Sequence, residues 1–231
     1  MTTAFITSSG TDIGKTHICC RLIKRLRPRV RLRCIKPIVS GFEPNAAEAT
    51  DTARLLRAQG LPIEAQTIDA TSPWRFLEPL SADMAAAREN RAVPFAELLE
   101  FCGPRAEHEL TLIEAIGGVM APIDDTRTVL DWLGALDAKV LLVVGSYLGS
   151  LSHTLTAVDV LAGRGRTPAA IVISQSESEP VPTEETAACL ARHCDGIPVT
   201  IVWRNDEQRT DASLAIVEQQ LLAGQKRPPA A

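Results

Sequence analysis

The sequence predicts an α/β fold: a doubly wound, mostly parallel sheet with helices on both faces. Short apolar segments alternate with stretches of helical periodicity along the chain. Several of these segments lack the polar alternation of half-exposed strands, which indicates a sheet that is covered on both sides. The first of them leads directly into a loop of small residues and then into a helix. In such a sheet, ligands bind at the edge formed by the carboxyl ends of the strands.

Six segments are predicted to be strands because they are short, apolar and rich in β-branched residues. They span residues 4–8, 31–35, 110–114, 140–145, 169–173 and 199–203. Helical spacing of apolar residues predicts eight helices, at residues 15–26, 46–58, 81–90, 94–101, 126–136, 151–162, 183–193 and 212–222. Pro94 suits a first helical turn, and Gly60 and Gly163 suit helix ends.

Length and composition limit the possible functions. The 231 residues are expected to form one domain over residues 1–224, followed by a disordered tail over residues 225–231. A formal net charge of −4 argues against general binding to nucleic acids or membrane surfaces, which requires a basic surface. The sequence has no apolar run of about eighteen residues and no signal-peptide pattern, and its cysteines form no CxxC pair. We therefore expect a cytoplasmic protein without a membrane span.

Residues 8–16 follow the first strand and have the composition of a phosphate-binding loop. They read Ser-Ser-Gly-Thr-Asp-Ile-Gly-Lys-Thr, and the first helix is predicted to begin at Lys15. Backbone N–H groups of such a loop, with the positive end of the helix, would bind the phosphates of a nucleotide. Lys15 would reach the β- and γ-phosphates, and the Thr16 hydroxyl would ligate Mg²⁺. Ser9 stands where the usual pattern has glycine, so a glycine-rich turn with a solvated lysine is the alternative; the flanking strand and helix favour the phosphate loop.

Two carboxylates are candidates for completing a magnesium site. Glu114 ends a predicted strand and so lies at the carboxyl edge of the sheet, and Gly117 beyond it lets the backbone approach a ligand. Asp51 stands near the start of a predicted helix, where capping that helix is the alternative role. Together with Thr16 and phosphate oxygens, the two acids would satisfy an ion that prefers oxygen ligands.

Two further segments follow predicted strands. Lys36 comes at the end of the second strand and is held by Pro37, so it would point toward the active edge; an ordinary surface lysine is the alternative. Residues 145–153 follow the fourth strand and form a Gly- and Ser-rich turn that could present free N–H groups to an anion. The alternative there is a simple turn in which Ser150 or Ser152 caps the next helix.

Taken in order, these segments resemble the dethiobiotin synthetase family. The resemblance covers residues 5–203 and rests on motifs that are specific only as an ordered set. The motifs are Gly-Thr-Asp-Ile-Gly-Lys-Thr at 10–16, Lys36-Pro37 with Ser40-Gly41, Asp51, Glu78-Pro79 with Ser81, Glu114 with Gly117-Gly118, and Leu148-Gly149 with His153.

The resemblance implies a phosphate-loop homodimer that uses ATP, Mg²⁺ and CO₂ to close a ureido ring on 7,8-diaminopelargonate. One amine becomes a carbamate, ATP phosphorylates the carbamate, and the second amine displaces phosphate. Since no protein nucleophile is needed, catalysis would rest on positioning and charge neutralisation.

The resemblance also implies roles for individual residues. Lys15 and Lys36 would hold the γ-phosphate and the developing carbamoyl phosphate, and Thr11 would be the third catalytic residue. The metal ligands would be Thr16, Asp51 and Glu114. The nucleotide would be bound by Asp12, Ile13, Gly14, Lys15, Thr16, Ile18, Glu114, Gly117, Ser174 and Gln175. The diamine and its carboxylate would be bound by Thr11, Ser40 and, across the dimer interface, Gly149, Ser150, Leu151 and Ser152.

Several positions depart from the family pattern. Ser8 replaces a glycine, Asp12 a glutamate, and Ser152 an asparagine of the carboxylate site. Ala115 also replaces a glycine, and it would be strained if the position requires a positive φ. Ser174-Gln175 stands where the family has the asparagine that reads adenine, so we expect looser base selectivity, with CTP or GTP accepted. The lysines, acids and threonine of the proposed centre all remain, and activity is expected.

Two other function classes stay open. A cobyrinate-type ligase also acts through an acyl phosphate, but such enzymes usually carry a glutaminase domain for which this sequence has no room. A partner-regulated switch ATPase of the partitioning type shares the fold, but usually has an extra lysine in the phosphate loop, where residues 8–10 are Ser-Ser-Gly. ATP turnover that requires the diamine would favour the synthetase.

Overall fold

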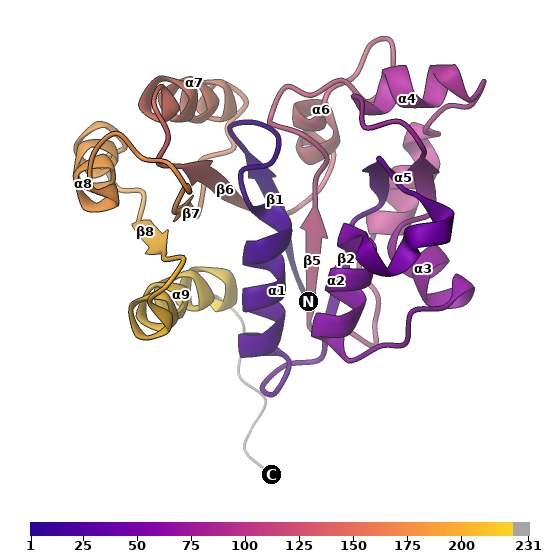
Figure 1. Ribbon diagram of the computed structural model, residues 1–231, viewed down its shortest axis with the longest axis horizontal. Coiled ribbons are helices and arrows are strands. Elements are labelled where there is room, and N and C mark those ends of the chain that lie inside the picture. Colours follow the sequence, from indigo (N-terminus) through magenta and orange to yellow (C-terminus); the bar gives the residue numbers. More distant parts are fainter. Residues whose placement is uncertain (224–231) are drawn as a thin grey trace.

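A six-stranded parallel sheet runs through the centre of the computed structural model, which describes residues 1–223 (Figure 1). Its strands are β1 (Thr2–Ser8), β2 (Leu32–Ile35), β5 (Leu110–Glu114), β6 (Lys139–Gly145), β7 (Ala170–Ser174) and β8 (Val199–Val202). Their order is β2-β5-β1-β6-β7-β8, and every neighbouring pair is parallel. The parallel sheet predicted from the sequence is therefore confirmed. The tail predicted over residues 225–231 lies outside the described residues.

Helices cover both faces of the sheet, so the fold is doubly wound as predicted (Figure 1). One face carries α1 (Lys15–Leu26), α2 (Asp51–Gln59) and α9 (Glu207–Leu222). The other face carries α5 (Phe95–Cys102), α6 (Val129–Gly134), α7 (Ser150–Gly163) and α8 (Thr183–His193). Successive side chains of a strand point to opposite faces, so Ala4 and Ile6 of β1 join the first core and Phe5 joins the second.

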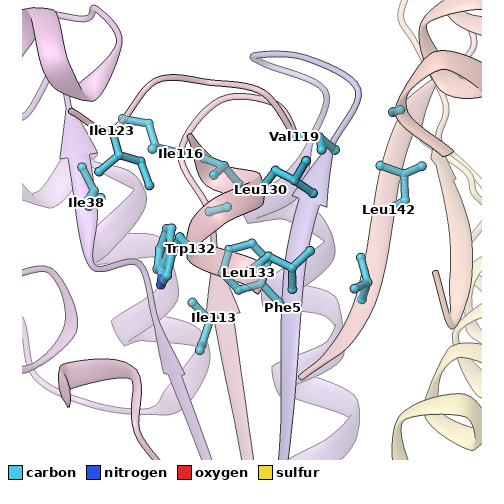
Figure 2. Close-up of a cluster of buried hydrophobic side chains, with 14 of the residues drawn as sticks. Phe5, Ile38, Ile113, Ile116, Val119, Ile123, Leu130, Trp132, Leu133 and Leu142 are labelled. Carbon is cyan, nitrogen blue, oxygen red and sulfur yellow. The ribbon is translucent and has the colours of Figure 1, made fainter. Parts of the chain in front are cut away.

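The second core fixes α6 against the sheet, as Figure 2 shows. Trp132 of α6 is fully buried, and its ring meets that of Phe5 edge-on with 4.8 Å between the centroids. Leu133 and Ile113 belong to the same cluster. Burying an aromatic or large aliphatic side chain contributes about 1.5–3 kcal/mol each. This packing therefore holds the loop between β5 and α6, which borders the phosphate loop.

A small second sheet, which has no counterpart among the strands predicted from the sequence, follows β2 along the chain. In it β3 (Ile38–Ser40) pairs in parallel with β4 (Trp74–Phe76). Two short helices, α3 (Ala65–Thr71) and α4 (Ala82–Arg88), flank β4 in the sequence, and only the second was predicted. Strands of three residues are too short to give a recognisable periodicity, and α3 has only one buried residue, Thr71, so it lacks an apolar face.

The helix predicted over residues 46–58 is divided in two. A 3₁₀ helix, η1 (Pro44–Ala49), comes first, and α2 begins only at Asp51. Between them Thr50 adopts an extended conformation, and its Oγ1 accepts a hydrogen bond from the Ala53 N–H at 3.3 Å. This is the geometry of an N-cap, which starts a new helix rather than continuing the old one.

All six strands of the main sheet deliver their carboxyl ends to one edge. The phosphate loop follows β1, Lys36 follows β2, and Glu114 is the last residue of β5. Further loops follow β6, β7 and β8 at the same edge. The topology thus brings together the candidate site residues, which come from distant segments of the chain.

The outer edge of β2 is closed by a side chain of α2. The Cys34 N–H donates to Gln59 Oε1 at 2.7 Å, and Gln59 Nε2 donates to the Cys34 carbonyl at 3.1 Å. The N–H and the carbonyl of Cys34 are therefore both hydrogen-bonded, although the described part of the chain has no further strand beside β2. No helix within residues 1–223 is long and apolar enough to cross a membrane.

Candidate active site

The segment between β1 and α1 forms a tight loop around Gly14. This glycine has a φ of 101° and is the N-cap of α1, whose first residue is Lys15. A Cβ at Gly14 would lie 2.4 Å from Ser174 Oγ, so the position requires glycine for space as well as for conformation. Asp12 also has a positive φ, 56°, which aspartate tolerates better than most residues. The loop presents backbone N–H groups at a helix N-terminus, an arrangement that binds anions.

Lys15 is buried, and its side chain folds back against the neighbouring loop. Nζ donates to the Gly117 carbonyl at 2.7 Å and to Ser8 Oγ at 3.0 Å. Burial lowers the pKa of Lys15 from 10.5 to about 8, although the charge of Glu114 acts in the opposite direction. The lysine is therefore held by carbonyl and hydroxyl dipoles rather than by a direct ion pair.

Ser8, at the position where the family pattern has glycine, adds a hydroxyl to this arrangement. Its Oγ accepts the bond from Lys15 and lies 2.5 Å from the Gly10 carbonyl and 3.0 Å from the Gly117 carbonyl. Either carbonyl can accept the hydroxyl proton. The side chain thus connects the start of the phosphate loop, its lysine and the loop after β5.

Lys36 joins the two candidate acids. Its Nζ lies 2.5 Å from Asp51 Oδ2 and 2.9 Å from Glu114 Oε1, and Thr16 Oγ1 donates to the same Glu114 oxygen at 2.5 Å. Burial lowers the pKa of Lys36, but the two carboxylates outweigh burial and hold this pKa above its usual value. For Asp51, burial raises the pKa and Lys36 outweighs it, so the carboxylate is ionised. Thr50, not Asp51, caps α2, so the alternative role considered for Asp51 is wrong.

Ala115 does not have the positive φ that would strain an alanine. Within residues 1–223, the only non-glycine residues with a positive φ are Asp12 and Asn90. The Ala115 N–H donates to the Ile6 carbonyl at 2.9 Å and so continues the pairing of β5 with β1. The turn is made instead at Gly117, where φ is 59°. Alanine at position 115 is therefore compatible with the backbone, and the condition under which it would be strained is not met.

The donor atoms beside Lys36 fit a magnesium ion. Glu114 Oε2 is buried and has no hydrogen-bond partner in the part of the chain that the structure describes. A buried carboxylate oxygen without a partner is uncommon and marks a place for a cation or water. Thr16 and Asp51 supply further oxygens. No group of three or more His, Cys, Asp or Glu side chains among the described residues could hold a metal unaided, so the ion would share phosphate oxygens, as Mg²⁺ does at nucleotide sites.

A cavity of about 690 Å³ opens beside the N-terminus of α1. Five of the predicted nucleotide-binding residues line it: Asp12, Ile13, Gly14, Ser174 and Gln175. Residues 203–205, Trp-Arg-Asn, line it as well and were not singled out from the sequence. They directly follow the last strand of the sheet, and that place at the carboxyl edge is the signal that could have identified them.

The side-chain amide of Gln175 already has partners at both ends. Oε1 accepts from the Arg204 N–H at 3.1 Å, and Nε2 lies 3.3 Å from Glu179 Oε1, to which it donates. Arg204 Nε also donates to the Gln175 carbonyl at 3.0 Å. The amide is therefore used to join two loops of the cavity wall.

The loop after β6 leads into α7 through Gly149, which has a φ of 94°. No side chain accepts a hydrogen bond at this N-cap, so capping by Ser150 or Ser152, the alternative considered above, is wrong. The loop leaves Leu148 84% exposed. Among the described residues, no hydrogen bond links residues 149–152 to the Lys36 cluster.

Three other predicted residues have distinct surroundings. Thr11 is exposed in the phosphate loop, and Ser40 is half-buried at the end of β3. Ile18 is completely buried in the core under α1, and its N–H donates to the Gly14 carbonyl at 3.0 Å. Because neither its side chain nor its amide is free, Ile18 belongs to the core, and its assignment to nucleotide binding is corrected.

Comparison with known proteins identifies the family. A family profile described as an AAA domain matches residues 2–218. The chain is 44% identical over 204 residues to the ATP-dependent dethiobiotin synthetase BioD of Acidiphilium cryptum (strain JF-5), covering 84% of this chain and 89% of that protein. The chain belongs to the dethiobiotin synthetase family. A second dethiobiotin synthetase, from Methylobacterium nodulans, is 42% identical over 213 residues, covering 88% of this chain and 94% of that protein. The expected family and an ATP-using ligase are thereby confirmed.

Two solved structures with the same fold come from cell division proteins. The cell division ATPase MinD of Pyrococcus furiosus matches with a TM-score of 0.54 at 12% identity, over 95% of this chain and 98% of that chain. The MinC:MinD cell division complex of Aquifex aeolicus matches with a TM-score of 0.53, also at 12% identity, over 100% of this chain and 99% of that chain. At these identities the likeness shows the phosphate-loop fold alone, and the sequence relatives favour the ligase over the switch ATPase.

Proposed function

We propose that this protein closes the ureido ring of dethiobiotin from 7,8-diaminopelargonate, CO₂ and ATP. The observation that carries the proposal is a buried, charged Lys36 held between Asp51 and Glu114 beside the phosphate loop of a dethiobiotin synthetase family member. One amine attacks CO₂ and loses a proton, which gives a carbamate. A carbamate oxygen then takes the γ-phosphoryl group and ADP leaves. The second amine attacks the carbamoyl carbon, loses a proton and releases inorganic phosphate.

The chain would contribute position and charge. Lys15 would exchange the Gly117 carbonyl for an oxygen of the γ-phosphate. Lys36, which keeps its proton, would neutralise the carbamate and the phosphoryl group as negative charge passes from one to the other. Thr11 and Ser40 would contact the carbamate and the diamine. No side chain needs to form a covalent bond.

Thr16, Asp51 and Glu114 would hold Mg²⁺ together with phosphate oxygens. When bound, the ion would neutralise charge on the β- and γ-phosphates. The unpartnered Oε2 of Glu114 supports this assignment, since Lys36 and Thr16 occupy only the other oxygen of that carboxylate.

We propose that base selectivity is relaxed. Gln175, which stands where the family has an adenine-reading asparagine, has its amide engaged by Arg204 and Glu179. The hydroxyl of Ser174 cannot replace a paired amide contact. CTP and GTP are therefore expected to support turnover within about tenfold of ATP, the effect of one hydrogen bond. A competition assay with the three nucleotides measures this, and a strong preference for ATP would contradict it.

A homodimer in the cytoplasm is the proposed assembly and location. Leu148, Met120 and Met84 are large apolar side chains left exposed by the single chain, and contact with a second copy would bury side chains of this kind. The backbone amides of residues 149–152 would bind the substrate carboxylate in the second copy. Six free cysteines suit a reducing compartment.

Product analysis tests the proposed reaction. Purified full-length protein is incubated with Mg²⁺ and ATP, with and without 7,8-diaminopelargonate and bicarbonate, and phosphate and dethiobiotin are followed, the latter by mass. We expect phosphate release to require both additions and dethiobiotin to form. Nucleotide hydrolysis that is indifferent to the diamine would overturn the proposal and indicate a partner-regulated ATPase.

A substitution at Glu114 tests the proposed metal site. Glu114→Gln keeps the shape but removes the charge that faces Lys36 and the metal position, so turnover is expected to fall by about a hundredfold or more. Circular dichroism and thermal melting verify that the variant is folded. Glu184→Gln, an exposed acid of α8, is the matched control and should keep full turnover. Unchanged turnover in folded Glu114→Gln protein would refute the metal assignment.

A further inference from the structure

A second cavity lies beside β2 and shares no lining residue with the nucleotide cavity. Its volume is about 460 Å³, within the range of roughly 300–1,000 Å³ typical of small-molecule sites. Residues of β2, of α3, of the ends of α2 and α5 and of the segment after α5 form its walls. These elements lie together at the β2 end of the sheet (Figure 1). The proposed reaction makes no use of this cavity.

The lining combines apolar side chains with nitrogen donors. The main apolar contributions come from Leu32, Leu61 and Phe101. The basic side chains are Arg33, Arg105 and His108, and the one acid among the lining residues is Glu107. A concave apolar surface with a few convergent polar groups is the usual composition of a ligand site.

The Arg33 side chain is held in place, but one of its nitrogens has no hydrogen-bond partner within residues 1–223. Its Nη2 donates to the Phe101 carbonyl at 3.2 Å, and its guanidinium lies over the Phe101 ring, 5.0 Å from the centroid. Its Nη1 is buried and has no hydrogen-bond partner among the described residues. Burial lowers the pKa of Arg33, and the charge of Arg105 lowers it further. A buried guanidinium nitrogen without an acceptor is unfavourable, so an acceptor supplied from outside would be stabilised there.

His108, on another wall of the cavity, also has a nitrogen without a hydrogen-bond partner among the described residues. Its Nδ1 is buried without a hydrogen-bond partner in the described chain, and the nearby Glu107 Oε1 is 3.8 Å away. Burial lowers the pKa of His108, and the charges of Arg33 and Arg31 act in the same direction against Glu107. Two residues with an unsatisfied nitrogen, Arg33 and His108 from separate segments, therefore line one cavity, in surroundings with an excess of positive charge.

We propose that this cavity binds an amphiphilic carboxylate, a ligand with one carboxylate on a short apolar body. The carboxylate would accept hydrogen bonds from Arg33 and from Arg105 or His108, because a guanidinium fork matches carboxylate geometry. The apolar body would lie against Leu32 and Phe101. Inorganic phosphate would meet the basic groups but leave the apolar wall in water. A neutral apolar molecule would leave Arg33 Nη1 without an acceptor.

Calorimetric titration of the full-length protein with octanoate tests the proposal. We expect one octanoate per chain, and binding at least about tenfold weaker in Arg33→Gln and in Arg105→Gln. Arg105 is exposed, so its substitution leaves the core untouched. Arg31→Gln is the matched control: Arg31 immediately precedes β2 and pairs with Glu109, but it does not line the cavity.

Two further probes test the carboxylate and the apolar body of the ligand one at a time. Octan-1-ol lacks the charge and phosphate lacks the apolar body, and each is expected to bind at least about tenfold more weakly than octanoate. If both variants bind octanoate as tightly as the unmodified protein, octanoate binds at another place, the active site included, and the proposal is overturned. Absence of octanoate binding, phosphate binding as tight as octanoate, or an equal loss in Arg31→Gln would overturn it too.

Discussion

The two lysines of the candidate active site have opposite surroundings. Lys15 is buried against carbonyl and hydroxyl oxygens, and burial lowers its pKa to about 8. Lys36 is buried as well, but Asp51 and Glu114 hold its pKa above the usual value. Dipoles offset the desolvation of a charge less fully than carboxylates do. Lys36 therefore stays charged near neutral pH, whereas Lys15 can lose its proton in mildly alkaline solution.

The pKa of Lys15 predicts proton uptake when nucleotide binds. The pKa of Lys15 is about 8 in the folded protein and about 10.5 in the unfolded chain. Between these two pH values the unfolded chain holds the proton and the folded protein does not. This group therefore increases the free energy of unfolding as the pH rises from about 8 to about 10.5. Phosphate charge favours the ammonium form. Calorimetry of ATP binding in two buffers of different ionisation enthalpy should give close to one proton taken up at about pH 9 and close to none at about pH 7. No uptake at the higher pH would contradict the assignment.

The hydroxyl of Ser8 is expected to restrain Lys15. In Ser8→Ala, Lys15 loses one of its two close acceptors and leaves the loop more readily for a phosphate. The KM for ATP is expected to fall several-fold, by about tenfold at most, since one hydrogen bond to a charged group is lost. Ser9→Ala is the control, because Ser9 Oγ has no hydrogen-bond partner within residues 1–223. A KM that stays the same or rises in Ser8→Ala would show that the hydroxyl does not hold the lysine back.

At the level of elements, the start of α2 decides where Asp51 lies. Thr50 caps the helix, and the next residue directs its carboxylate to Lys36. Thr50→Ala is expected to lower the free energy of unfolding by about 1 kcal/mol, the usual loss for an N-cap, while Thr50→Ser keeps most of it. Urea denaturation of the two variants measures the difference. Equal stability of Thr50→Ala and the unmodified protein would mean that η1 and α2 do not depend on this cap.

The elements that could be predicted are those with a local signal. β1 and β5 are buried apolar runs, and the loop after β1 has glycine and lysine at recognisable spacing. The small sheet could not be predicted, because β3 and β4 have three residues each and pair with each other across a long stretch of chain. The break at Thr50 was missed because the residues on both sides of it have helical propensity.

At the level of the whole molecule, the site could be predicted in part. Strand ends indicated that Lys36, Glu114 and the phosphate loop share one edge, but the sequence does not give the strand order that places β5 between β2 and β1. That order sets the contact of Lys36 with Glu114, and the packing of α2 adds Asp51. The part of the nucleotide cavity formed by residues 203–205 likewise depends on long-range packing.

The pairing of Gln59 with Cys34 has a consequence for how two copies of this chain can meet. An open sheet invites strands from neighbouring molecules to add at its edges, and such growth has no natural end. At the β2 edge that route is obstructed at Cys34, since Gln59 already satisfies both the N–H and the carbonyl of this residue. A strand of another copy would have to displace Gln59 before it could pair with Cys34. The glutamine therefore acts against open-ended growth of the sheet at its β2 end.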